Sequence, residues 1–119
     1  TGVSGSSDVF RGGITPYDRE LKRSLLGCPD VPAVSEEMAV AMARGVCRAL
    51  GADSGLAVTG VAGPAPLEGN EPGDVWIAVH YDDETESRFL KMPFDRERIR
   101  QFTCIQSLNL LRTRILASS

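Results

Sequence analysis

The stretch from Val75 to Tyr81 constrains the fold of this chain more than any other part of the sequence. Its mainly apolar side chains occupy both alternating sets of positions, Val75, Ile77, Val79 and Tyr81 on one face and Trp76, Ala78 and His80 on the other. A strand with two apolar faces needs cover on both sides, because exposed apolar surface is unfavourable in water. We therefore expect a buried strand over 75–81 inside a layered domain.

Three further strands are expected around this one. The apolar run Leu56–Thr59 ends at a glycine and predicts a second buried strand. Asp82-Asp83-Glu84 predicts a hairpin turn that leads into a returning strand over Arg88–Met92. A short strand is also expected near Val9–Ile14, after a glycine-rich start.

Helix start and stop signals predict three helices. The first runs from Asp18, a good N-cap, to Leu26, and is closed by Gly27 and Pro29. The second begins at Ser35 and ends at Gly51, with a buried stripe of Met38, Met42, Val46 and Leu50. The third covers Arg96–Leu116, is capped by Asp95, and has an apolar stripe of Ile99, Phe102, Ile105, Leu108, Leu111 and Ile115.

This element order predicts one layered domain. A chain of 119 residues is long enough for one hydrophobic core and too short for two. Helices and strands in this order indicate an α/β or α+β sandwich with helices on the sheet faces. We expect a central mixed sheet that includes Leu56–Thr59 and Val75–Tyr81, with the Ser35–Leu50 and Arg96–Leu116 helices packed on it.

Charge and composition exclude several classes of protein. The formal charge is −3, from 13 basic and 16 acidic residues, which argues against general nucleic-acid binding. No apolar run approaches the roughly 20 residues of a membrane helix, so no membrane association is expected. The first residues have neither the basic region nor the apolar core of a signal peptide, and we expect a cytoplasmic protein.

The cysteines and the single histidine do not form a metal-binding pattern. Cys28, Cys47 and Cys104 are far apart and odd in number, so we expect buried or partly buried free thiols. His80 lies in an alternating apolar stretch whose neighbours supply no further ligands. We expect no metal and no cofactor.

Two places could carry chemistry. With Asp18 as N-cap, Tyr17 and Lys22 take the positions that meet across the first helical turn, so a phenol and an amine can share one site. The positive helix end disfavours a charged lysine, and a neutral Lys22 could act as a general base. The spacing by itself is common and favours a structural role.

The second place is the loop Thr59-Gly60-Val61-Ala62-Gly63-Pro64, directly after a strand. Its glycines could let backbone amides bind an anion or an oxyanion, and a tight structural turn is the alternative. It lacks the residues of a phosphate-binding P-loop. Basic residues that could bind a phosphate, or form a solvated face, open the last expected helix: Arg96, Arg98 and Arg100.

Taken together, these segments resemble the C-terminal domain of the competence/damage-inducible protein CinA family, the nicotinamide-nucleotide amidases. The matching segments are collinear and span nearly the whole chain: Gly5-Ser6-Ser7 and Gly12-Gly13, Tyr17 through Lys22 and Leu25-Leu26-Gly27, Ala33-Val34-Ser35-Glu36-Glu37 and Ala41-Met42-Ala43, Thr59-Gly60-Val61-Ala62-Gly63-Pro64, Gly73-Asp74-Val75-Trp76, and Asp95-Arg96. The resemblance implies a three-layer α/β/α sandwich.

The resemblance also implies a function. Members of the family hydrolyse the carboxamide of nicotinamide mononucleotide to nicotinate mononucleotide and ammonia, with a serine nucleophile, a nearby tyrosine and lysine, and no metal. Tyr17 and Lys22 match the tyrosine and the lysine, and Thr59, Gly60, Ala62, Gly63 and Arg96 are the candidate substrate-binding residues. A small nucleotide substrate and a homo-oligomer are therefore the expected partners.

The chain also departs from the family pattern. The family's serine lies in a Glu-Ser-Cys-Thr-Gly-Gly stretch ahead of Gly5-Ser6-Ser7, so residues 1–119 match the domain without its N-terminal helix-strand-helix segment and should be inactive alone. The loop between Gly60 and Gly73 lacks the family's glycine run and its Lys-Pro pair. The alternatives are a non-catalytic nucleotide-binding or oligomerisation module, or a competence-linked protein-interaction domain.

Overall fold

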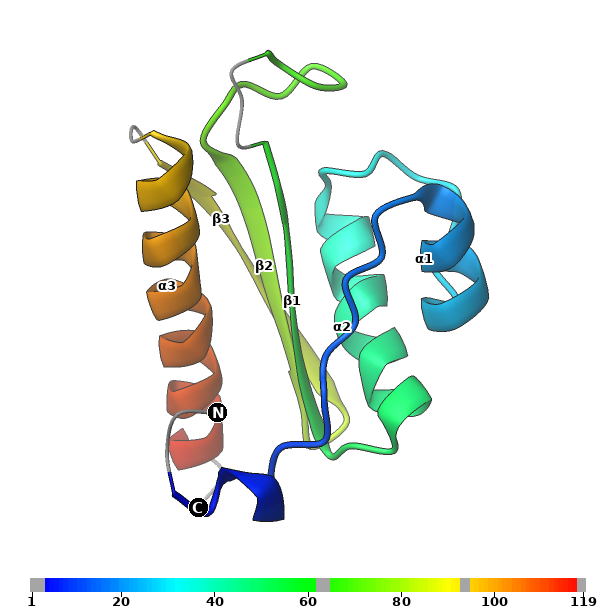
Figure 1. The fold of residues 1–119 in the computed structure, drawn as a ribbon, viewed down its shortest axis with the longest axis vertical. Helices are drawn as coiled ribbons and strands as arrows, with labels where there is room; N and C mark the ends of the chain where they lie inside the picture. The colour runs from blue at the N-terminus through cyan, green and yellow to red at the C-terminus, as the bar shows by residue number, and fades with distance from the viewer. Residues whose placement is uncertain (1–3, 62–64, 93–94, 118–119) are drawn as a thin grey trace.

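The computed structural model describes residues 4–61, 65–92 and 95–117. Its elements, in chain order, are a short 3-10 helix η1 (Ser6–Asp8), helices α1 (Arg19–Leu26) and α2 (Glu36–Leu50), strands β1 (Ser54–Gly60), β2 (Asp74–Tyr81) and β3 (Glu84–Lys91), and helix α3 (Arg96–Ala117) (Figure 1). All three expected helices and three of the four expected strands are present.

The described strands form one antiparallel sheet in the order β1-β2-β3. Strand β2 lies in the centre and pairs along its whole length with both neighbours. The β2–β3 turn has two central residues with positive φ, Asp82 at 53° and Asp83 at 64°. Such two-residue turns match the twist of antiparallel strands, and aspartate tolerates this conformation. The expected hairpin is confirmed, although β3 begins at Glu84, earlier than expected.

Helices cover both faces of the sheet. Val75, Ile77 and Val79 point toward α3, where they share a core with Ile99 and Leu110. The alternate β2 residue Ala78 and the β1 residue Ala57 belong to a second core with α2, around Met38, Ala39 and Ala43. Figure 1 shows the three layers, with α3 on one side of the sheet, α2 on the other, and α1 beyond α2. The expected α/β architecture with covered faces is confirmed.

Two glycines allow the layers around α2 to approach closely. A side chain at Gly45 in α2 would collide with the backbone carbonyl of Leu26 at the end of α1. A side chain at Gly55 in β1 would place a Cβ atom 2.6 Å from the carbonyl oxygen of Ala43 in α2. Glycine at both positions lets backbone pack against backbone, so α1, α2 and β1 form one tightly packed unit.

The helix ends lie where the capping residues predict. Asp18 accepts a hydrogen bond from the Leu21 amide at 2.8 Å, and Ser35 accepts one from the Met38 amide at 3.2 Å. Asp95 accepts from the Arg98 amide at 3.0 Å at the start of α3. Gly27 and Gly51, with φ of 65° and 62°, end α1 and α2 in the left-handed conformation that favours glycine.

The expectation of a mixed sheet is wrong for the described residues, and so is the strand near Val9–Ile14. Residues 9–14 form no strand, and the chain runs past α2 and β1 without pairing (Figure 1). Each described strand pairs with the strand next to it in the sequence, and both pairs are antiparallel. A mixed sheet would need a parallel pair, which requires a crossover connection between its two strands. Val9 and Phe10 in this segment are exposed.

The apolar stripe predicted for the last helix is also wrong. Ile99 is buried and Leu111 half-buried, but Phe102, Ile105, Leu108 and Ile115 are exposed. Residues three positions apart on an α-helix lie about 60° short of a full turn from each other. Residues 99, 102, 105, 108 and 111 therefore wind around α3 and do not share one face. The face that packs on the sheet is formed by Ile99, Thr103, Ser107 and Leu110.

The cysteines and the histidine mostly behave as expected. All three cysteines are free, and Cys28 and Cys47 are buried, but Cys104 is exposed on α3, against expectation. His80 Nδ1 lies 2.9 Å from the hydroxyl of Thr85 across the β2–β3 hairpin, a structural contact. Within the described residues, no group of three or more His, Cys, Asp or Glu could hold a metal ion, and no helix is long and apolar enough to cross a membrane.

Candidate active site

The start of α1 brings the two predicted catalytic side chains into one groove. Asp18 caps the helix, so Tyr17 lies just before it and Lys22 one turn later. Both residues line the same groove, in which Tyr17 is 87% exposed and Lys22 is half-buried. An accessible phenol and a partly enclosed amine are the two groups that the sequence predicts here.

This groove is large and open. Its volume is about 1400 Å³, above the roughly 300–1,000 Å³ of typical ligand pockets, so a mononucleotide would fill only part of it. Its walls come from residues 8–17, from β1, from the loop residue Leu67 and from the C-terminal half of α3. Thr59 and Gly60, predicted to bind substrate, line it together with Tyr17 and Lys22. The fold therefore brings together residues that lie about forty positions apart in the sequence.

The end of β1 is fixed against the segment that precedes α2. The Thr59 hydroxyl donates a hydrogen bond to the backbone carbonyl of Ala33, and the Thr59 side chain is buried. At Gly60, an added Cβ atom would lie 2.8 Å from Cγ2 of Val75 on the neighbouring strand. The Thr59 hydrogen bond thus fixes the end of β1, and packing against β2 favours glycine at position 60.

The other predicted binding residues are not all in the groove. Arg96 is exposed on the first turn of α3 and does not line the groove. Arg100, one turn later, lines a separate apolar pocket of about 420 Å³ between β1 and α3. Ala62 and Gly63 lie outside the described residues.

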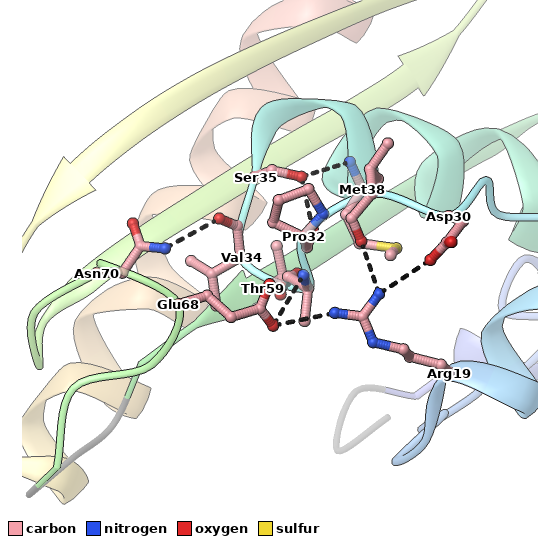
Figure 2. A network of polar contacts seen from close by, with 11 residues as sticks. Arg19, Asp30, Pro32, Val34, Ser35, Met38, Thr59, Glu68 and Asn70 are labelled. Atoms are coloured by element: carbon pink, nitrogen blue, oxygen red, sulfur yellow. Dashed lines mark hydrogen bonds and ion pairs between the residues drawn. The ribbon is translucent and has the colours of Figure 1, made fainter.

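A polar network beside the groove was missed by the sequence analysis (Figure 2). It joins Arg19 of α1 and Ala33 of the segment before α2 to Glu68 of the β1–β2 loop. The Glu-Gly-Asn stretch 68–70 is a turn signal that could have predicted the local hairpin. Nothing in the sequence indicates that its carboxylate reaches α1.

Two titratable groups near the site have shifted pKa values. A hydrogen bond from Lys91, at 2.6 Å, lowers the pKa of Asp74, whose carboxylate also accepts from the Glu71 amide and so fixes the end of the β1–β2 loop. Burial raises the pKa of the Cys28 thiol, although the nearby charges of Lys22 and Arg48 oppose this effect. Cys28 is therefore held as a neutral thiol and is a poor candidate for a nucleophile.

Known proteins resemble this chain in sequence and in fold. The sequence model of the CinA C-terminal domain matches residues 1–115. The chain belongs to the CinA C-terminal domain family. A CinA-like protein from Frankia casuarinae is 45% identical over 122 residues, covering 98% of this chain and 28% of that protein. A CinA-like protein from Geotalea daltonii is 40% identical over 123 residues, covering 98% of this chain and 30% of that protein. The chain thus spans under a third of these curated relatives.

Solved structures of the CinA family share the fold. The competence/damage inducible protein CihA from Agrobacterium tumefaciens superposes with a TM-score of 0.87 at 28% identity, covering 93% of this chain and 72% of that one. The competence damage-inducible protein A from Klebsiella pneumoniae gives 0.79 at 30% identity, covering 85% of this chain and 66% of that one. The layered arrangement of helices and sheet is therefore that of the CinA superfamily.

Proposed function

We propose that this chain is the general-base and substrate-binding part of a nicotinamide-nucleotide amidase. The observation that carries the proposal is the position of Tyr17 and Lys22 in one groove with Thr59 and Gly60. Membership of the CinA family supports the same activity. The substrate is nicotinamide mononucleotide, and the products are nicotinate mononucleotide and ammonia.

The reaction needs a nucleophile, a proton carrier and binding groups. A serine hydroxyl attacks the carboxamide carbon, and the amine of Lys22 takes its proton and passes it to the departing ammonia. Water then hydrolyses the acyl-serine ester to the carboxylate and free serine. Tyr17 orients the amine of Lys22, and the backbone of the loop after β1 binds the phosphate. Arg96 lies outside the groove of its own chain, so its contact with the phosphate would be made across a subunit boundary.

We propose that the serine comes from a helix-strand-helix segment ahead of residue 1. Two features of the described residues support this placement. No described strand pairs with the outer edge of β1. The adjacent apolar pocket is lined by Leu56, Val58 and Leu108, among others, and could accept the side chains of an added strand and helix.

The test is ammonia release from nicotinamide mononucleotide by a form that carries the Glu-Ser-Cys-Thr-Gly-Gly segment, with the 119-residue chain as control. We expect turnover in the longer form and none in the shorter one. Nicotinamide riboside, which lacks the phosphate, should be a poorer substrate because binding energy from the phosphate is lost. A longer form without activity would refute the proposal.

A second candidate function is a non-catalytic oligomerisation module. It is favoured by the free outer edge of β1 and by the exposed apolar residues of α3, since both are features that pair or pack with another chain. In this case light scattering should give a mass of at least two copies for the 119-residue chain, and the longer form should release no ammonia.

A further inference from the structure

A small hairpin in the β1–β2 loop lies beside the candidate active site. The backbones of Leu67 and Asn70 exchange two hydrogen bonds, of 3.0 and 2.8 Å. The two residues between them have positive φ, 49° at Glu68 and 81° at Gly69. This conformation suits glycine but is unfavourable for glutamate. A glutamate in this position therefore suggests that its side chain has a task that outweighs the strain.

The Glu68 carboxylate connects the hairpin to two other segments (Figure 2). Its Oε1 atom accepts hydrogen bonds from Nη2 of Arg19 at 3.1 Å and from the Ala33 amide at 3.4 Å. From the other side of the hairpin, the side-chain Nδ2 atom of Asn70 donates a hydrogen bond to the backbone carbonyl of Val34 at 3.2 Å. Both sides of the hairpin are thus attached to the segment before α2.

Arg19 is itself held in place. Its Nη1 atom donates to the Val31 carbonyl at 3.1 Å and forms an ion pair with Asp30 at 3.3 Å. Arg19 is the first residue of α1, directly after Tyr17 and the Asp18 cap. The guanidinium therefore ties the hairpin to the helix end that carries the predicted catalytic pair.

The hairpin presents Leu67 to the groove. Leu67 is 46% exposed and lines the groove together with Tyr17 and Thr59. The exposed apolar side chain of Leu67 can pack against the face of a flat ring bound in the groove. In the proposed substrate the pyridine ring is the only such group, and it carries the carboxamide.

We propose that the Arg19–Glu68 ion pair is a positioning clasp that holds Leu67 as the apolar wall for the substrate ring. This inference rests on the proposed function. The side chains of Arg19 and Glu68 are 50% and 30% exposed, and ion pairs this accessible contribute little to global stability. The effect of the clasp should therefore appear in substrate affinity and in the order of residues 65–73, and not in the melting temperature.

The test is calorimetric binding of nicotinamide mononucleotide to the 119-residue chain, which under the proposed function should bind the substrate without turning it over. Glu68→Gly removes the clasp but relieves the strained backbone, so a purely structural turn would be unharmed or improved. We expect about 3- to 10-fold weaker binding for Glu68→Gly and for Leu67→Ala, as for loss of a partly buried apolar contact. Hydrogen exchange at the Leu67 and Asn70 amides should rise in Glu68→Gly.

Glu71→Gln is the matched control, because the Glu71 carboxylate in the same loop makes no ion pair within the described residues. Its affinity should equal that of the wild type. The double variant Leu67→Ala/Glu68→Gly should bind no more weakly than the worse single variant, since both changes remove the same contact.

Each remaining outcome is decisive. Unchanged affinity in Glu68→Gly and Leu67→Ala refutes the clasp while leaving the proposed function standing. Faster hydrogen exchange with unchanged affinity also refutes it, because the hairpin would then be ordered by the ion pair without serving the ligand. A wild-type chain that does not bind the mononucleotide refutes the groove as the substrate site, and the clasp with it.

Discussion

The two helices that cover the sheet, α2 and α3, differ in how they use their apolar side chains. Helix α2 buries Met38, Ala39, Met42 and Ala43 between the sheet and α1. Helix α3 has more large apolar residues than α2, but Phe102, Ile105, Leu108 and Ile115 are exposed. The α2 side is a completed core, whereas the α3 side, with the outer edge of β1, is open. The difference separates a face that is packed within the chain from one that is available to further chain, whereas the groove with Tyr17 and Lys22 borders both helices, since Val46 of α2 and Leu108 of α3 line it.

The largest expected effect tests whether the open groove carries the chemistry. In a form with the upstream serine, Lys22→Ala should reduce ammonia release by about 10²–10⁴-fold, as for loss of a general base, and leave folding intact. Tyr17→Phe should cost less, because it removes only an orienting hydroxyl. Steady-state kinetics together with circular dichroism measure both. Activity near wild type in Lys22→Ala would refute the assignment.

The second prediction compares the two helices directly. Met38→Ala should reduce the free energy of unfolding by about 2–5 kcal/mol, because Met38 is 1% exposed and its loss leaves a cavity. Ile105→Ala should change it by less than about 0.5 kcal/mol, because Ile105 is 61% exposed. Urea denaturation measures both values. A large effect at Ile105 would contradict an open α3 face and indicate that another copy covers it.

The third prediction concerns Arg96 at the start of α3. If Arg96 binds the substrate phosphate, Arg96→Ala should raise KM by about 10-fold or more and lower kcat less, because a contact remote from the reacting carboxamide is largely uniform binding. Arg98→Ala, next to it on an exposed turn, is the control. An unchanged KM would place the phosphate elsewhere, at the backbone after β1.

The smallest effect concerns the loop that connects β1 and β2. The hydrogen bond from Lys91 lowers the pKa of Asp74 in the folded protein below that of an unfolded aspartate. The ionised carboxylate therefore stabilises the fold at pH values above the unfolded pKa, and this stabilisation is lost as the pH falls through the pKa of the folded state. Lys91→Ala should reduce stability at pH 7 by about 1 kcal/mol and weaken its dependence on pH below about 4. Thermal melts from pH 7 to pH 2 measure this. An acid response identical to the wild type would contradict the pairing.

Local hydrogen bonding explains which elements could be predicted. The ends of α1 and α2 follow from Asp18, Gly27, Ser35 and Gly51, because capping side chains and left-handed glycines act on their own helix. The β2–β3 turn follows from Asp82-Asp83 for the same reason. The Asp18 cap also defined the positions of Tyr17 and Lys22, but it was the resemblance to the CinA family, and not the spacing, that indicated a function for the pair.

The tertiary structure alone decided the rest. The sequence determined that a strand over 75–81 needs cover on both faces and that two helices with apolar residues are available to cover it. It did not determine which face of α3 is buried, because two of the residues that face the sheet, Thr103 and Ser107, are polar and carry no apolar signal. Nor did it determine that residues 9–14 stay unpaired or that Glu68 reaches Arg19. These features depend on contacts between segments far apart in the chain, and no local pattern encodes such distances.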